Sequence, residues 1–228
     1  RGSMDASRYK DYMLGLMFDK FLSDKTLEAF QTTSGVTGTT EEIVTAYESA
    51  YEKHGDMLLK MIEGLLGYYV LPEHLYQRWL ADINDGAFEL EKVTESLQAF
   101  ERNIASTKEA DDFQGLFSSS TIDFTDTALG NNLNARSRNV QKLIGLFADL
   151  DMVALQKGDV LGDAYEYLIG QFAMESGKKA GEFYTPRQVS EVMAQIVAKT
   201  TEVETIYDPT VGSGSLLLTV SKHLSPDA

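Results

Sequence analysis

The chain has 228 residues, of which 43% are hydrophobic and 24% charged, as is typical of a globular protein rather than a disordered or fibrous one. Its formal net charge of −15, from 35 acidic and 20 basic residues, disfavours tight binding of nucleic-acid phosphates by this chain alone. The absence of cysteine excludes disulfides and cysteine-ligated zinc and fits a cytoplasmic protein. No apolar run approaches the roughly 20 residues that span a bilayer, so no membrane association is expected.

The first residues predict where the natural protein starts. Arg1, Gly2 and Ser3 precede Met4 and resemble residues left by a cloning vector, so Met4 is the expected natural start. Asp5 follows at once and no signal peptide is predicted.

Apolar residues at helical spacing predict an all-helical domain over residues 4–150. The predicted helices cover residues 8–23, 41–54, 56–66, 72–79, 88–104 and 137–150. The predicted connections are a loop over 31–40, a short extended piece over 68–71 and an irregular, partly anchored segment over 113–136. The first helix is so apolar that it should pack on several sides, as the central helix of a bundle; contact of part of it with a partner subunit is the alternative.

Several residues in this region have both a structural and a functional interpretation. Trp79, the only tryptophan, is expected in the core rather than stacked on a base or a partner. Histidines occur at three scattered positions without ligand partners at metal spacing, and no metal site is predicted; they are His54, His74 and His223.

A small basic cluster lies near the start of the last helix of this domain. Arg136, Arg138 and Lys142 are expected to be a solvated helix end, with a phosphate contact as the less favoured alternative because the surrounding sequence is acidic.

A second domain is predicted from residue 151, with the boundary near residues 151–158. A helix is expected over 159–174, and Glu166 on it is expected to be solvated or capping rather than a catalytic acid. Only one strand is predicted before residue 228, and one strand cannot form a sheet, so we expect the chain to be a fragment of a longer protein that contains the beginning of an α/β, Rossmann-like domain.

The most informative stretch begins with a predicted helix. Thr185 can cap it, Pro186 suits its first turn and Gln188 completes a capping box. The apolar residues that follow repeat with helical spacing and predict one apolar face; they are Val189, Val192, Met193, Ile196 and Val197.

A short strand and a glycine-rich turn come next. Residues 205–207 are β-branched or aromatic and predict the strand, at whose end Asp208 lies. Gly212 and Gly214 allow a tight turn before the apolar run at 216–218, which is expected to be helical. A strand, a glycine turn and a helix in this order can hold a nucleotide-like ligand, although a plain tight turn is equally compatible with the spacing. The turn is not G-x-G-x-x-G, and it lacks the lysine of a P-loop.

The paired motifs GEFYTPR, at 181–187, and DPTVGSGSLL, at 208–217, resemble those of N6-adenine DNA methyltransferases, specifically the modification subunit of type I restriction–modification systems. The similarity extends to residues 159–168 and 12–18. It implies an S-adenosylmethionine site. By this resemblance the site would be formed by Glu182, Phe183, Tyr184, Thr185, Pro186, Arg187, Asp208, Gly212, Ser213 and Gly214. Asp208 could pair with the amino group of the cofactor or order the turn through its own backbone; both interpretations remain open.

The family's catalytic Asn-Pro-Pro-aromatic motif is absent from residues 1–228, and no ribose-binding acid is identified. We therefore expect no catalytic residue in this chain and no DNA methylation by it alone. The resemblance implies a specificity subunit, a restriction subunit and DNA as partners of the full complex. The alternatives are a non-catalytic helical interaction module and a stand-alone adenine DNA methyltransferase.

Overall fold

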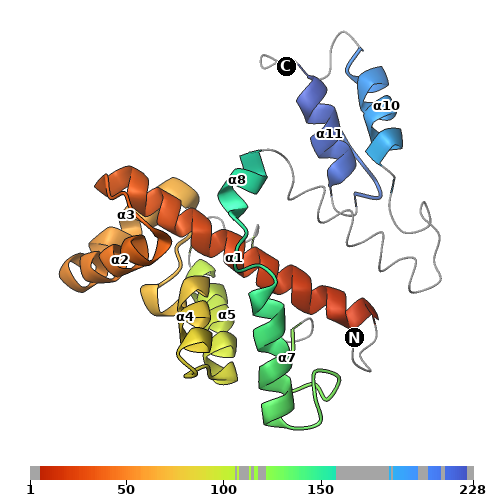
Figure 1. The fold of residues 1–228 in the computed structure, drawn as a ribbon. Helices are drawn as coiled ribbons and strands as arrows, with labels where there is room; N and C mark the ends of the chain where they lie inside the picture. Colours follow the sequence, from red (N-terminus) through yellow and green to blue (C-terminus); the bar gives the residue numbers. More distant parts are fainter. Residues whose placement is uncertain are drawn as a thin grey trace. The chain divides into compact units, whose positions relative to one another are not determined.

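The computed structural model describes most of the chain. The described residues are 6–105, 107, 113, 116–117, 122–157, 185, 187–199, 205–211 and 214–224. The chain divides into two compact units, Arg1–Leu161 and Gly162–Ala228. Every regular element within the described ranges is a helix (Figure 1), which confirms the expected mainly helical fold. The expected start of an α/β sheet is not confirmed, because no strand occurs in these ranges.

The first unit is built around one long helix. Its helices are α1 (Ala6–Ser34), α2 (Thr40–His54), α3 (Asp56–Leu66), the 3-10 helix η1 (Pro72–His74), α4 (Tyr76–Asn84), α5 (Leu90–Ile104), α7 (Leu133–Gly145) and α8 (Met152–Lys157). Helix α1 packs against α2, α3, α4, α7 and α8 (Figure 1), as expected of a central bundle helix. The predicted helix over 159–174, with Glu166, lies outside the described residues.

Helix α1 is longer than the sequence pattern indicates: it continues to Ser34, beyond the expected end at residue 23. The polar residues after position 22 suggest the end of a helix, but Asp24 among them pairs with a residue of the same helix. Lys20 and Asp24 form an ion pair one turn apart, and Phe30 further along is buried. The expected loop is therefore shortened at its start, and Gly35, with φ of 72°, ends the helix.

Helix α4 begins later than predicted. The expected continuous helix over 72–79 is wrong, because Leu75 has an extended backbone between η1 and α4. Leu75 is fully buried, and the amide of Tyr76 donates to the hydroxyl of Ser23 on α1, at 3.0 Å. The break between η1 and α4 therefore places Leu75 in the core, and the first amide of α4 is satisfied by a side chain of α1.

Helix α7 also differs from its expected bounds of 137–150. It begins at Leu133 because the side chain of Asn132 accepts a hydrogen bond from the amide of Ala135 at 2.9 Å, and it ends at Gly145 in a series of turns. The predicted apolar face is confirmed nonetheless, since Val140 and Ile144 are completely buried.

The segment before α7 is irregular and anchored where it is described. Ile122 and Phe124 are buried, and the hydroxyl of Tyr12 on α1 donates to the carbonyl of Asp123. Gly15 allows this close approach: a Cβ atom there would lie 2.1 Å from Cδ1 of Ile122. The partial anchoring expected for residues 113–136 is confirmed for this part of the segment.

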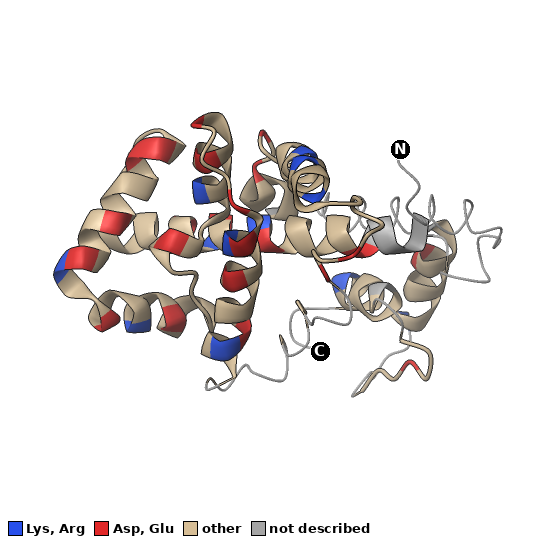
Figure 2. Cartoon of the chain, turned by 90° about the horizontal axis from the view of Figure 1, so that it is seen from below, with Lys and Arg blue, Asp and Glu red and all other residues tan. Residues whose placement is uncertain are grey.

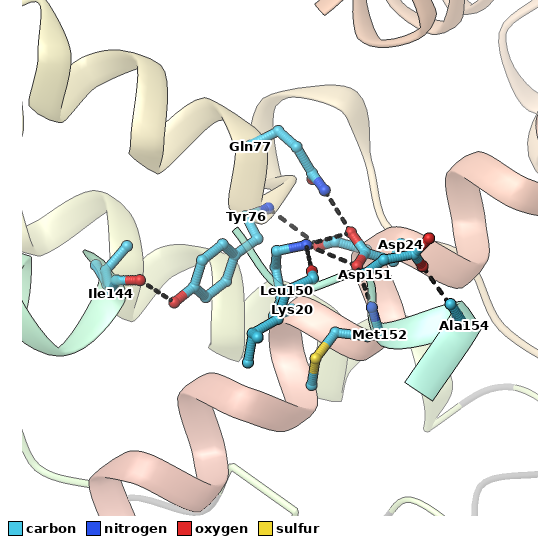
Figure 3. Close-up of polar contacts among 10 residues, drawn as sticks. Lys20, Asp24, Tyr76, Gln77, Ile144, Leu150, Asp151, Met152 and Ala154 are labelled. Carbon is cyan, nitrogen blue, oxygen red and sulfur yellow. Dashed lines mark hydrogen bonds and ion pairs between the residues drawn. The ribbon is translucent and has the colours of Figure 1, made fainter. Parts of the chain in front are cut away.

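A buried polar network joins α1, α4 and α8 (Figure 3). The ammonium of Lys20 donates to both carboxylate oxygens of Asp24, at 2.7 and 2.6 Å, and to the carbonyl of Leu150, at 3.1 Å. Asp24 also accepts from the amide nitrogen of Gln77 at 2.6 Å and from the backbone amide of Met152 at 3.2 Å. Helix α8 is thus attached to α1 by its first amide.

Beside this network, Asp19 is buried and its Oδ2 has no hydrogen-bond partner among the described residues. Burial raises the pKa of Asp19 well above its usual value, because desolvation disfavours the charged carboxylate.

None of the described helices is both long and apolar enough to cross a membrane.

Candidate functional site

The predicted cofactor site lies in the second unit, and the structure describes part of it. Thr185, the backbone of Arg187, Asp208 and Gly214 are described. The remaining predicted site residues lie outside the described ranges; these are Glu182, Phe183, Tyr184, Pro186, Gly212 and Ser213. Their placement around a cofactor stays a prediction.

Each of the two motifs leads into a helix, and the two helices are α10 (Arg187–Val197) and α11 (Ser215–His223). The helices lie side by side (Figure 1). Small residues form the contact surface, since Ser190 and Ala194 of α10 and Val220 of α11 are buried. At the edge, Nε2 of His223 lies 2.6 Å from Oε1 of Glu191. The elements that follow the two motifs therefore pack against each other.

The apolar face predicted on α10 exists but is not buried. Its members are between 39% and 67% exposed; they are Val189, Val192, Met193, Ile196 and Val197. The small side faces inward instead, because two helices approach most closely where their side chains are short.

The turn at the start of the second motif is ordered by Asp208. Its Oδ1 accepts from the backbone amide of Thr210 at 2.8 Å and from the Thr210 hydroxyl at 3.1 Å. Gly214 has φ of 74° and its amide donates to the carbonyl of Val211 at 2.7 Å, so a glycine is needed where α11 begins. One of the two roles considered for Asp208, ordering its own turn, is thus present in the structure.

The segment before Asp208 is not a strand here. Residues 205–207 belong to no helix or strand, and Tyr207 is 85% exposed. A strand requires a neighbour to accept its backbone hydrogen bonds, and the described part of the chain supplies none.

The excess of acidic over basic residues in the sequence is spread over the helices of the structure (Figure 2). Figure 2 shows acidic positions spread over the helices, with basic positions interspersed. In the basic cluster on α7, Arg138 and Lys142 are exposed, whereas Arg136 is half-buried and donates from Nη1 to the carbonyl of Gly130 at 3.4 Å. Part of this cluster therefore has a structural role, and a phosphate contact there is only a hypothesis.

Metal ligands do not cluster in the described ranges, where no group of three or more His, Cys, Asp or Glu side chains could hold an ion.

A cleft lies in the first unit between α2, η1, α4 and α5, and no sequence motif predicts it. Its volume is about 460 Å³, and charged side chains line much of it. Its residues come from separate helices, and no spacing along the chain brings them together.

Comparison with known proteins identifies the family. The model described as the HsdM N-terminal domain matches residues 1–147, and the model described as N-6 DNA Methylase matches residues 156–228. The type I restriction enzyme MpnII methylase subunit of Mycoplasma pneumoniae is 29% identical over the whole chain, which covers 42% of that protein. The MjaVIII methylase subunit of Methanocaldococcus jannaschii is 42% identical over 85 residues, which are 37% of this chain and 14% of that protein.

A solved structure extends the likeness to the fold. The type I restriction–modification methyltransferase subunit of Streptococcus thermophilus has a TM-score of 0.83 and 38% identity, over 96% of this chain and 46% of that one. The chain thus spans less than half the length of these relatives. Because one family model covers most of the chain and the other covers both motifs, the chain belongs to the family of type I restriction–modification methylase subunits.

Proposed function

We propose that the chain is the N-terminal part of a methyltransferase subunit that transfers a methyl group from S-adenosylmethionine to N6 of adenine in a specific DNA sequence. The observation that carries the proposal is the match of residues 156–228 to the N-6 DNA Methylase family, because this region contains both cofactor motifs. The packing of α10 on α11 supports it, since the helices that follow the motifs are held together.

The expected site uses residues from both motifs. Phe183, Tyr184, Thr185 and Pro186 would line the cofactor pocket, flanked by Glu182 and Arg187. The backbone of Gly212, Ser213 and Gly214, at the start of α11, would approach the methionine end, where N–H groups at a helix start suit its carboxylate. Asp208, already fixed by Thr210, would offer its second oxygen to the cofactor's amino group.

The assembly would be completed by other chains. Relatives bear the name of type I restriction enzyme methylase subunits, which supports a complex with a specificity subunit, a restriction subunit and DNA, in the cytoplasm. The net charge of −15 supports a DNA-binding surface that is formed mainly outside this chain.

Methyl transfer tests the proposal directly. The chain of residues 1–228 and the full-length protein with its specificity subunit would each be incubated with DNA and cofactor labelled in the methyl group. We expect label in adenine N6 only with the full-length complex, because residues 1–228 contain no Asn-Pro-Pro-aromatic motif. Label from the chain alone would contradict the predicted inactivity. A full-length protein without that motif and without activity would favour the helical interaction module.

The proposed role of Asp208 in cofactor binding can be separated from its role in the turn by comparing two variants, Asp208→Asn and Asp208→Ala. Asn can still accept from Thr210, so Asp208→Asn should keep the turn and the thermal stability. It should nevertheless weaken S-adenosylmethionine binding by about tenfold or more, because a charge-assisted hydrogen bond is lost. Calorimetric titration of the full-length protein measures this. If Asp208→Asn binds like the wild type and only Asp208→Ala is impaired, Asp208 serves the turn alone.

A further inference from the structure

The cleft of the first unit has four helical walls. Tyr51 comes from α2, Pro72 from η1, Asp82 from α4 and Glu95 from α5, and together with their neighbours they enclose about 460 Å³. Helix η1 packs on α2, α4 and α5, so it joins the walls. The cleft is therefore part of the folded helical unit and independent of the predicted cofactor motifs.

Two cations in the cleft are already paired. Arg78 on α4 lies 3.3 Å from Glu48 on α2, and Lys92 on α5 lies 3.3 Å from Asp82 on α4. Each pair joins two walls.

Three further carboxylates line the cleft: Glu52, Glu73 and Glu95. They are exposed, and each lacks a cationic partner among the residues described. The cleft thus has an excess of negative charge after its own cations are counted.

A histidine adds another acceptor, and its tautomer follows from a buried network. Ser96, 2% exposed, donates its only hydroxyl proton to the carbonyl of Lys92 at 2.8 Å and accepts from the indole N–H of Trp79 at 3.3 Å. Nδ1 of His74 lies 3.0 Å from the same hydroxyl oxygen, and when Ser96 donates to Lys92 this ring nitrogen is the donor. In the neutral ring, Nε2 is then an acceptor, and it has no partner among the described residues.

The charge state of His74 agrees with this assignment. Burial lowers the pKa of His74; Glu73 and Glu95 raise it by less than burial lowers it, and Arg102 adds a smaller lowering. The ring is therefore neutral at neutral pH.

We propose that this cleft binds an arginine side chain from a basic segment of a partner protein. A guanidinium offers five N–H donors in one plane and carries a fixed positive charge, and the unpaired carboxylates of the cleft accept such donors. Tyr51 supplies a ring face on which the flat guanidinium can stack. Phosphate is repelled by the same carboxylates, so nucleic acid is not the ligand.

The experiment is a titration of the isotope-labelled full chain with a short blocked peptide, Ala-Arg-Ala-Ala-Arg-Ala, followed by NMR. Trp79 is the only tryptophan, so its indole N–H gives one resonance, next to Ser96 and His74. We expect a saturable shift of this resonance with the arginine peptide and none with the peptide in which neutral citrulline replaces arginine. No shift, or equal shifts with both peptides, would overturn the proposal. So would an equal effect of spermidine, which would assign the cleft to cations in general.

Matched variants locate the binding site. Glu73 and Glu95 are exposed and make no hydrogen bond to another described residue, so the double variant Glu73→Gln/Glu95→Gln should fold normally and weaken binding about tenfold. The double variant Glu41→Gln/Glu91→Gln makes the same change of two charges, on α2 and α5 outside the cleft, and should change the affinity less than twofold. Equal weakening by this control would show that only the overall charge matters and would contradict a site in the cleft.

Discussion

Replacing Asp24 by alanine is expected to lower the free energy of unfolding of the helical unit by about 3–5 kcal/mol, because it leaves a buried ammonium without its counter-ion. The side chain of Lys20 is 6% exposed and that of Asp24 12%. Without Asp24, Lys20 keeps only the carbonyl of Leu150, and the amides of Gln77 and Met152 lose an acceptor (Figure 3). Urea unfolding of the chain, followed by circular dichroism, measures the loss.

The cost of burying an unpaired charge also predicts that removing both Lys20 and Asp24 lowers the free energy of unfolding less than removing Asp24 alone. Burial raises the pKa of Asp24, and this outweighs the lowering by Lys20 and by the hydrogen bonds from Met152 and Gln77. A carboxyl with a raised pKa in the fold is more stable in its protonated form, so its ionisation at neutral pH costs stability, and this cost disappears as the pH falls through that pKa. The ion pair therefore stabilises less than its short distances suggest.

The double variant Lys20→Met/Asp24→Leu tests this. It should be at least about 2 kcal/mol more stable than Asp24→Ala, since no charge is left buried. Hydrogen exchange of the Met152 amide is a second readout, which should accelerate in both variants because both lack its acceptor. A double variant as unstable as Asp24→Ala would show that the hydrogen bonds, rather than the stranded charge, dominate.

Most helices of the first unit could be predicted from the sequence, because the residues that start and end them lie close together along the chain. Helix α2 has a capping box in which Thr39 and Glu42 exchange hydrogen bonds, and Gly55 follows its end. Such signals lie within a few residues of each other. The errors occurred where a distant residue decides: Ser23 on α1 caps α4 across 53 residues, and the core position of Leu75 breaks the expected helix there.

The candidate cofactor site was predictable as motifs but not as geometry. The turn at Asp208 could be expected, because an aspartate two residues before an amide readily forms such a turn. The side of α10 that packs against α11 could not be predicted, because helical periodicity identifies an apolar face but does not identify the neighbour that covers a face. Ser190 and Ala194 are buried against α11 only because the two helices meet. The cleft could not be predicted from the sequence, because its carboxylates come from separate helices and form no motif within any one of them.

Replacing Trp79 by alanine is expected to cost about 3–5 kcal/mol of unfolding free energy, because a large buried side chain leaves a cavity. Trp79 is 2% exposed, its ring centroid lies 5.1 Å from that of Tyr76, and its indole N–H donates to Ser96. This burial confirms the core interpretation and excludes stacking on a base in this conformation. Circular dichroism during urea unfolding is the measurement, since the only tryptophan is lost.

Two controls separate packing from polar and surface effects. Trp79→Phe keeps most of the ring and loses the indole donor, so it should cost clearly less than alanine; Ser96 still accepts from His74 and donates to the carbonyl of Lys92. Met57→Ala, at a residue that is 69% exposed on α3, should change stability by less than about 0.5 kcal/mol. If Trp79→Ala were as mild as Met57→Ala, the tryptophan would not be part of the core. If Trp79→Phe were as severe as alanine, the bond to Ser96 would matter more than the ring, because both variants lose the indole N–H and only alanine loses the ring as well.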